Sequence, residues 1–339
     1  MHRSTPAQNS ALEESLYDQQ TTPPASRGVT STNRLRSLIS SLRPRQWTKN
    51  LTVFVGIIFS QHLFILESLA RAILACLAFC CASSFVYVFN DIHDRENDKL
   101  HPIKRKRPIA SGVLPVSWAL ALMAALLLAC GVFVELLHFL PEAAQFDIFA
   151  DLGGSDLLFA LAILSYVGIM VLYSIYLKHM VLIDVFIIAG GFVIRVLAGV
   201  VVIPVFISPW LYLVTILLAL FLALNKRRHE INLLEEQAGS HRRILLDYSL
   251  PMLDQLITIV AAATVISYSL YTFQGPTGNH GLMVTIPFIL YGMFRYLYLV
   301  HMRQEGGNPE EVLVHDRHIL GTVTLCVAIV MLVLYVFHL

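Results

Sequence analysis

The most distinctive stretch of the sequence is an acidic segment that turns basic within a few residues, NDIHDRENDKLHPIKRKRPIASG at positions 90–112. A helix continuing through its first nine residues places Asn90, Asp91, Asp94 and Asp98 on one face, within about 100° of arc. Crowded carboxylates repel one another unless a cation lies between them, and hard oxygen ligands without a thiolate favour Mg²⁺, or Mn²⁺, over zinc. We therefore predict that these four residues bind a divalent metal and that the three aspartates are catalytic. A solvated acidic helix end is the alternative.

The basic part of the same stretch supplies Lys104, Arg105, Lys106 and Arg107. Mg²⁺ held by a few carboxylates keeps coordination positions for substrate phosphates. Nearby cations neutralise the charge that accumulates on a leaving diphosphate. A cluster that only fixes membrane topology is the simpler interpretation for some of these residues, but topology does not require the adjacent carboxylates. We predict that Lys104, Arg105 and Arg107 contact a substrate diphosphate.

A second basic cluster, in the stretch ALNKRRHE, contains Lys226, Arg227 and Arg228, with Glu230 as the nearest acid. Such a cluster suits a phosphate that is bound directly rather than through a metal. Consecutive helical residues point about 100° apart, so we do not expect all three cations to face one pocket.

Polar residues within apolar stretches are further candidates, because a charge at membrane depth is costly and is usually functional. Asp184 and Arg195 share a helix face about 16 Å apart along its axis, too far for direct pairing. Arg195 suits a substrate site and a structural ion pair with a neighbouring helix equally well. Tyr173 and Lys178 lie at a helix end beside the predicted pocket, where Lys178 either contacts a substrate phosphate or snorkels to the interface. Lys49, in the basic stretch at the start of the first apolar segment, either meets anionic lipid or belongs to a specific phosphate site.

Membrane-spanning helices must position these residues, because 56% of the chain is apolar and only 14% is charged. Nine apolar stretches are long enough to cross about 30 Å of hydrocarbon as helices. The sequence therefore predicts an all-α polytopic membrane protein. The nine stretches lie near residues 48–66, 68–90, 115–139, 156–177, 180–203, 208–226, 252–273, 281–302 and 318–338.

The distribution of charge predicts the orientation in the inner (plasma) membrane. Lysine and arginine concentrate in alternate connections, so the N-terminus and the predicted site face the cytoplasm and the C-terminus lies on the opposite side. Residues 1–33 are polar and predict a disordered cytoplasmic tail. Residues 34–47 predict an amphipathic helix in the membrane interface, and 48–339 form the transmembrane domain.

The stretch at 90–112 resembles the first aspartate-rich motif of the UbiA superfamily of intramembrane prenyltransferases, NDxxDxxxD followed by a basic loop. The resemblance implies a UbiA-like bundle of nine transmembrane helices, in which Mg²⁺ bound by Asn90, Asp91, Asp94 and Asp98 holds a substrate diphosphate. The sequence departs from that pattern at ALNKRRHEINLL, which is basic where a second aspartate-rich motif is expected.

This departure, together with RPRQWTKN, YSIYLKHMVLIDVFIIAGGFVIRVLAGV and GGNPEEVLVHDRHIL, is similar to the decaprenyl-phosphate phosphoribosyltransferase branch of the superfamily. The likeness runs from about Arg43 to the C-terminus. It implies transfer of 5-phosphoribose from phosphoribosyl pyrophosphate to a polyprenyl phosphate, with release of diphosphate, for arabinose-containing cell-envelope glycan precursors. The cations at 226–228 then bind the 5-phosphate.

A polyprenyl phosphate is already an anion, so we predict charge stabilisation and positioning rather than a proton-transferring residue. An aromatic prenyltransferase of the same fold, with a prenyl diphosphate donor, is the closer alternative. A transporter or lipid-binding protein without catalysis is the further one. No nucleic-acid partner is expected, and a homo-oligomer stays open.

Overall fold

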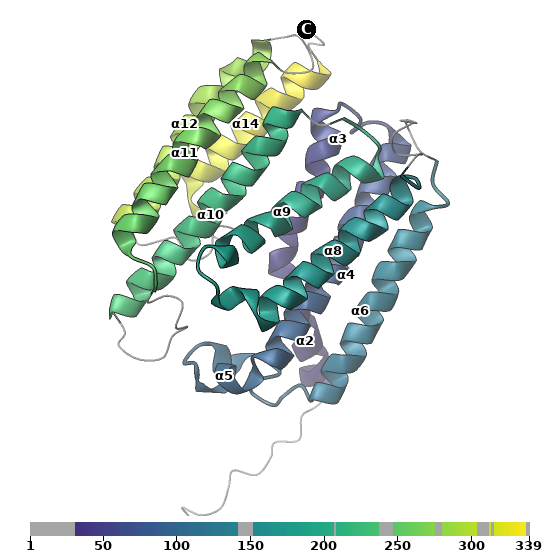
Figure 1. Cartoon of the computed structure of the whole chain (residues 1–339). Coiled ribbons are helices and arrows are strands. Elements are labelled where there is room, and N and C mark those ends of the chain that lie inside the picture. The colour runs from purple at the N-terminus through teal and green to yellow at the C-terminus, as the bar shows by residue number, and fades with distance from the viewer. Residues whose placement is uncertain are drawn as a thin grey trace, which may run out of the picture.

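The computed structural model describes residues 31–141, 152–206, 208–236, 247–274, 280–303, 312 and 315–336. This part of the chain is helical, and eight of its helices are long and apolar enough to cross a membrane (Figure 1). The all-α polytopic fold is confirmed. The eight helices are α4 (Leu66–His93), α6 (Val116–Leu137), α8 (Ser155–Ile175), α9 (Ile183–Val202), α10 (Pro209–Glu236), α11 (Leu250–Phe273), α12 (Ile286–Met302), which the 3₁₀ helix η5 (His280–Thr285) precedes, and α14 (Arg317–Tyr335).

Shorter helices connect and flank these spans. Helix α2 (Ser31–Leu42) covers part of the segment 34–47 for which an amphipathic helix is predicted, while most of the predicted tail lies outside the described residues. The remaining short elements are η1 (Pro44–Phe54), α3 (Val55–Phe59), α5 (Arg95–Leu100), η2 (Lys104–Lys106) and η3 (Leu177–His179).

The first predicted span, 48–66, differs from the prediction because η1 and α3 replace one long helix. The segment packs with its backbone against α9, where a Cβ at Gly199 would lie 2.0 Å from the Val53 carbonyl oxygen. Its buried Asn50 accepts a hydrogen bond of 2.8 Å from Arg195 Nε. The close backbone contact and the buried polar side chain show that this segment packs inside the bundle rather than against lipid.

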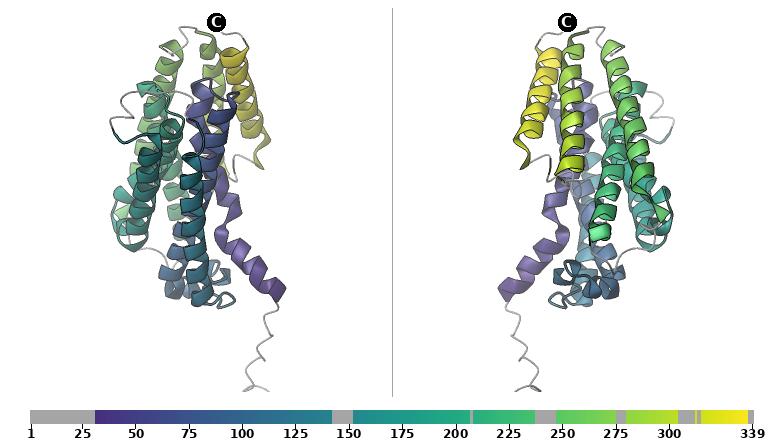
Figure 2. Two further views of the ribbon diagram at one scale, coloured as in Figure 1. Left: turned by 90° about the vertical axis from the view of Figure 1, so that its right-hand side faces the viewer. Right: turned by 90° about the vertical axis from the view of Figure 1, so that its left-hand side faces the viewer.

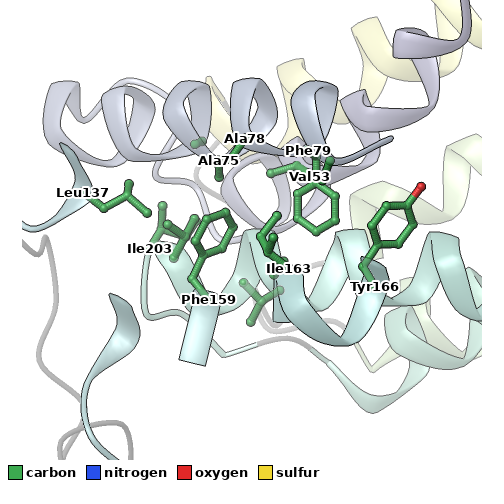
Figure 3. Packing of buried hydrophobic residues seen from close by; sticks show 14 of the residues in the cluster. Val53, Ala75, Ala78, Phe79, Leu137, Phe159, Ile163, Tyr166 and Ile203 are labelled. Carbon is green, nitrogen blue, oxygen red and sulfur yellow. The ribbon is translucent and has the colours of Figure 1, made fainter. Parts of the chain in front are cut away.

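Two apolar clusters form most of the core, and α9 belongs to both. One lies among η1, α4, α6, α8 and the second half of α9 (Figure 3). There the ring of Phe79 packs edge-on against Phe159 and Tyr166, with centroids 6.1 and 5.5 Å apart. The other lies among the first half of α9, α10, α11 and α12. Helix α9 therefore places Asp184 and Arg195 in the two halves of the bundle.

The end of the bundle opposite α5 is tied together by Arg71, a fully buried residue of α4 (Figure 1). Arg71 donates hydrogen bonds to the carbonyl oxygens of Val202 (2.6 Å) and Leu137 (3.0 Å), which end α9 and α6. It also donates to Ser155 Oγ (2.9 Å) and forms an ion pair with Asp156, both at the start of α8. One guanidinium group thus joins four helices.

Candidate active site

The predicted acidic residues gather where α4 ends and α5 begins. Helix α4 ends at His93. The helical course continues through two backbone hydrogen bonds of 2.8 Å, from Asp94 N to the carbonyl oxygen of Asn90 and from Asp98 N to the carbonyl oxygen of Asp94. Asp91 and Asp98 are buried, with 3% and 4% of their surfaces exposed. The helical prediction therefore places these residues together correctly.

Two arginines neutralise the buried pair of aspartates. Asp91 Oδ1 accepts hydrogen bonds from Arg43 Nη2 at 2.5 Å and from Arg107 Nη1 at 3.0 Å. The same Arg107 nitrogen donates to Asp98 Oδ2 at 2.6 Å. Asp91 and Asp98 therefore converge on one cationic group.

The third aspartate has a different partner. Asp94 Oδ1 lies 2.6 Å from the Nζ atom of Lys178, which η3 holds in a buried position. Lys178 therefore contacts the acidic cluster rather than extending to the surface. Asn90 lies half-buried on the preceding turn of α4.

These contacts pair the three aspartates with three cations, which are Arg43, Arg107 and Lys178. Within the described ranges, no three Asp, Glu, His or Cys side chains are grouped closely enough to hold one metal ion while these ion pairs are formed, and the predicted metal site stays a prediction. The donor set still fits a hard divalent cation, because it consists of three carboxylates and the amide oxygen of Asn90, which are oxygen ligands.

A second polar cluster surrounds Arg227 on α10. Arg227 Nη2 lies 2.8 Å from Asp184 Oδ2, and the same side chain forms an ion pair with Glu230 and a hydrogen bond with Tyr173. The hydroxyl of Tyr248 donates to Asp184 Oδ1 at 2.7 Å. Burial and the Asp184 carboxylate raise the pKa of Tyr248, so its hydroxyl keeps its proton and its role as donor.

The next residue, Arg228, points towards α11 instead. Its Nε donates to Asp254 Oδ1 at 2.6 Å, and the same oxygen lies 3.3 Å from His301 Nε2. Arg228 Nη1, Arg227 Nε and Asn225 Oδ1 are buried and have no hydrogen-bond partner among the described residues. Unsatisfied buried polar atoms are rare in native proteins, so each of these atoms is a candidate contact for a polar ligand.

The connection between α8 and α9 joins the two clusters. Tyr173, at the end of α8, contacts Arg227, while Lys178 in η3 contacts Asp94. Asp184, in the first turn of α9, completes the pair with Arg227. An acidic and a basic cluster therefore flank one short segment.

Arg195 forms hydrogen bonds within the bundle, and its predicted role in a substrate site stays a prediction. It donates to Asn50 Oδ1, to the Gly191 carbonyl oxygen and to the Tyr166 hydroxyl at 2.7–2.8 Å, and it lies 4.5 Å from the centre of the Tyr166 ring. No carboxylate in the described part of the chain pairs with it. Of the remaining predicted binding residues, Lys49, Lys104 and Lys226 are half-buried and Arg105 is exposed.

Several residues of the site were not predicted. Arg43 adopts the left-handed conformation (φ 53°, ψ 58°), which costs a non-glycine residue about 1–3 kcal/mol. Arg43 and Asp91 are far apart along the chain, so the sequence did not indicate that they pair. Asp254 offered a signal, because it is an acid within an apolar stretch. Tyr248 lies in a connection and offered none.

Comparisons with known proteins agree with this geometry. The UbiA prenyltransferase family matches residues 50–312. A decaprenyl-phosphate phosphoribosyltransferase of Mycolicibacterium smegmatis is 31% identical over 300 residues, which cover 84% of this chain and 88% of the relative. The protein of that name from Mycobacterium tuberculosis is 30% identical over 306 residues, 88% of this chain and 91% of the relative.

The solved structures support the same fold. A UbiA homologue from Archaeoglobus fulgidus bound to GPP and Mg²⁺ superposes with a TM-score of 0.65 at 19% identity, covering 88% of this chain and all of that one (100%). The same homologue bound to DMAPP and Mg²⁺ gives a TM-score of 0.64 at 20% identity, over 88% of this chain and 99% of that one. The match over most of the chain, together with the shared fold, shows that this protein belongs to the UbiA prenyltransferase family.

Proposed function

We propose that the chain is an integral membrane enzyme that transfers 5-phosphoribose from phosphoribosyl pyrophosphate to a polyprenyl phosphate and releases diphosphate. The observation that carries the proposal is the pairing of an acidic cluster with a basic one across the α8–α9 connection. Phosphoribosyl pyrophosphate has anionic groups at both ends of the ribose, whereas a prenyl diphosphate has them at one end only. The names of the relatives support the same donor and acceptor.

The acidic cluster serves the leaving diphosphate in this proposal. Asn90, Asp91, Asp94 and Asp98 would hold Mg²⁺, with Mn²⁺ as the other option, and the bound ion would supply positive charge for the departing diphosphate. Arg107 and Lys178 lie against these acids and are placed to donate to diphosphate oxygens. Lys104 and Arg105, which follow on η2, add positive charge nearby.

The basic cluster serves the 5-phosphate. Among the described residues, Arg227 Nε and Arg228 Nη1 are donors without a partner, and Lys226 precedes them on α10. Asp184, Glu230 and Tyr173 hold the Arg227 guanidinium in place. A direct charged hydrogen bond to phosphate contributes about 1.5–3 kcal/mol, which is enough to select a donor that carries this group.

The acceptor needs position rather than activation. Its phosphate is ionised at neutral pH and attacks carbon 1 of the ribose as diphosphate leaves, through an oxocarbenium-like transition state. Lys49 is the candidate for its phosphate, and Arg195 lies deeper in the same half of the bundle. The active site opens to the cytoplasmic face of the plasma membrane, where the soluble donor meets the lipid, and the product enters arabinose-containing envelope glycans.

The proposal is tested by incubating the purified protein with ribose-labelled phosphoribosyl pyrophosphate, polyprenyl phosphate and Mg²⁺. Label is expected in the lipid extract, and it should be absent when polyprenyl phosphate is omitted. A parallel reaction contains labelled prenyl diphosphate and an aromatic acid. An unlabelled lipid extract in the first reaction, or prenyl transfer in the second, would show that the chain is an aromatic prenyltransferase or a non-catalytic lipid-binding protein instead.

A further inference from the structure

A groove of about 470 Å³ lies between α12 and α14, away from both polar clusters. Figure 2 shows these two helices side by side at the surface of the bundle. The groove is apolar along Phe288 and Leu325, and Tyr291 lines it nearer its polar end. Helices α9, α10 and α11 pack in sequence between the acidic cluster's half of the bundle and α12, so the groove is not an extension of the candidate active site.

The polar end of the groove is cationic. Arg317 and His318 form the first turn of α14 and are exposed, and the Tyr291 hydroxyl lies 3.2 Å from His318 Nδ1. Asp316, the residue before Arg317, already pairs with Arg295 at 2.8 Å and accepts a hydrogen bond from Ile319 N. Arg317 forms no ion pair with another residue that the structure describes, and its side chain is exposed at the groove.

The Arg317 side chain lies at the depth in the membrane at which phospholipid phosphates are found. Helix α14 has 19 residues and is therefore about 28 Å long, close to the thickness of the hydrocarbon layer. Its first turn accordingly lies at one membrane interface, at the level of phospholipid headgroups. A cation at this level above an apolar groove is complementary to one anionic headgroup with its acyl chain.

A glycine keeps the groove open. A Cβ at Gly321 would meet no atom within 4 Å, so the space beside this residue is not filled by the protein. Glycine weakens a helix interior relative to alanine, and no close helix contact requires it here. A larger side chain at this position would occupy the groove without a clash.

We propose that the α12–α14 groove binds an anionic glycerophospholipid of the bilayer. Its phosphate contacts Arg317 and the His318 imidazole, and one acyl chain lies along Gly321, Leu325 and Phe288. The ligand is a structural phospholipid rather than the polyprenyl phosphate acceptor, because the groove is on the far side of α11 from the acidic cluster. This site does not depend on the proposed transferase activity.

The test measures bound lipid directly, by native mass spectrometry of protein taken from nanodiscs that contain equal amounts of phosphatidylglycerol and phosphatidylcholine. The wild-type chain is expected to retain phosphatidylglycerol. Arg317→Gln should weaken retention about ten- to a hundredfold, as expected for the loss of a charged hydrogen bond. Gly321→Leu should abolish retention, because its side chain fills the groove.

Matched controls are available on this chain. Arg303→Gln removes an exposed arginine at the end of α12, and Gly131→Leu adds the same side chain on α6, where a Cβ also meets nothing within 4 Å. Both controls should retain lipid as the wild type does. Equal retention in Arg317→Gln and wild type, or equal losses in the controls, would overturn the proposal. A change of oligomeric mass in Gly321→Leu would also overturn it, because a second copy of the chain would then cover the groove.

Discussion

At the scale of residues, the candidate site is a set of buried acids that each have a basic partner. Arg107 lies between Asp91 and Asp98, and Lys178 holds Asp94. Removing one member of a buried pair leaves the other charge uncompensated, so substitutions here affect both folding and ligand binding. Tests at these positions therefore need a control on the same element and a measurement of the folded fraction.

We expect Asp98→Asn to lower the rate of transfer by about a hundredfold or more, because under the proposed function it removes charge that would hold the metal and diphosphate in the transition state. Excess chelator should abolish wild-type transfer. Glu96→Gln is the control, since Glu96 is on the same short helix, its side chain is 76% exposed and it pairs with Lys99. Turnover numbers are measured on protein that elutes as a single folded species. Near-wild-type turnover in Asp98→Asn would contradict the metal assignment.

Arg228→Gln should raise the KM for phosphoribosyl pyrophosphate about ten- to a hundredfold and leave the KM for polyprenyl phosphate unchanged, because one charged hydrogen bond to phosphate is lost. Asp254→Asn is the informative comparison. It removes the ion-pair partner of Arg228 but keeps the guanidinium, so donor KM should stay near the wild-type value. If the two variants have the same kinetics, Arg228 serves the packing of α10 against α11 and not the donor.

The residue types of the site could be predicted from the sequence, but their pairing could not. The helical period places Asp91 and Asp98 on one face, and the structure agrees. That both acids share Arg107, and that Lys178 reaches Asp94, depends on how α4 meets the α8–α9 connection. Arg43 was missed for the same reason, since its role arises from contact between segments distant in the chain.

At the scale of elements, the lengths of apolar runs predict the long helices well. The run at 115–139, for example, corresponds to α6 at Val116–Leu137. The prediction of one long helix at 48–66 is wrong, because the backbone of this segment packs closely against that of α9. Its Val53 carbonyl contacts α9 at Gly199, a contact that hydropathy does not register.

Gly199→Ala should lower the free energy of unfolding by about 1–3 kcal/mol, because the new methyl group meets a backbone oxygen that cannot rotate away. Gly131→Ala on α6 meets no atom within 4 Å and should stabilise the protein by up to about 1 kcal/mol. Thermal unfolding in detergent measures both. Equal midpoints for the two variants would show that η1 moves freely away from α9.

At the scale of the whole molecule, polar residues fasten both ends of an otherwise apolar bundle. Arg71 joins α4, α6, α8 and α9 at one end, and the two clusters of the candidate site join α4, α8, α9, α10 and α11 at the other. In a membrane, apolar side chains have little preference for helix contacts over lipid contacts, so such polar contacts help to define helix neighbours.

Arg71→Met should destabilise the protein by about 3 kcal/mol, because Asp156 and the carbonyl groups that end α6 and α9 lose their donor. Arg71→Lys should recover only part of this loss, since one ammonium group cannot span four helices. Arg36→Met on the exposed surface of α2 is the control. The midpoint of thermal unfolding is the measurement, and an unchanged midpoint in Arg71→Met would contradict the structural role.

The short connection between α8 and α9 limits the distance between the two phosphate groups of a donor that both clusters can bind. Lys178, in η3 within the connection, contacts Asp94, and Tyr173, in the last turn of α8, contacts Arg227, so a short length of chain links the two clusters. Under the proposed function, the connection sets the distance between the two phosphate-binding clusters and so selects a sugar with phosphates at both ends. A donor lengthened by one methylene between ribose and 5-phosphate would reach only one cluster at a time.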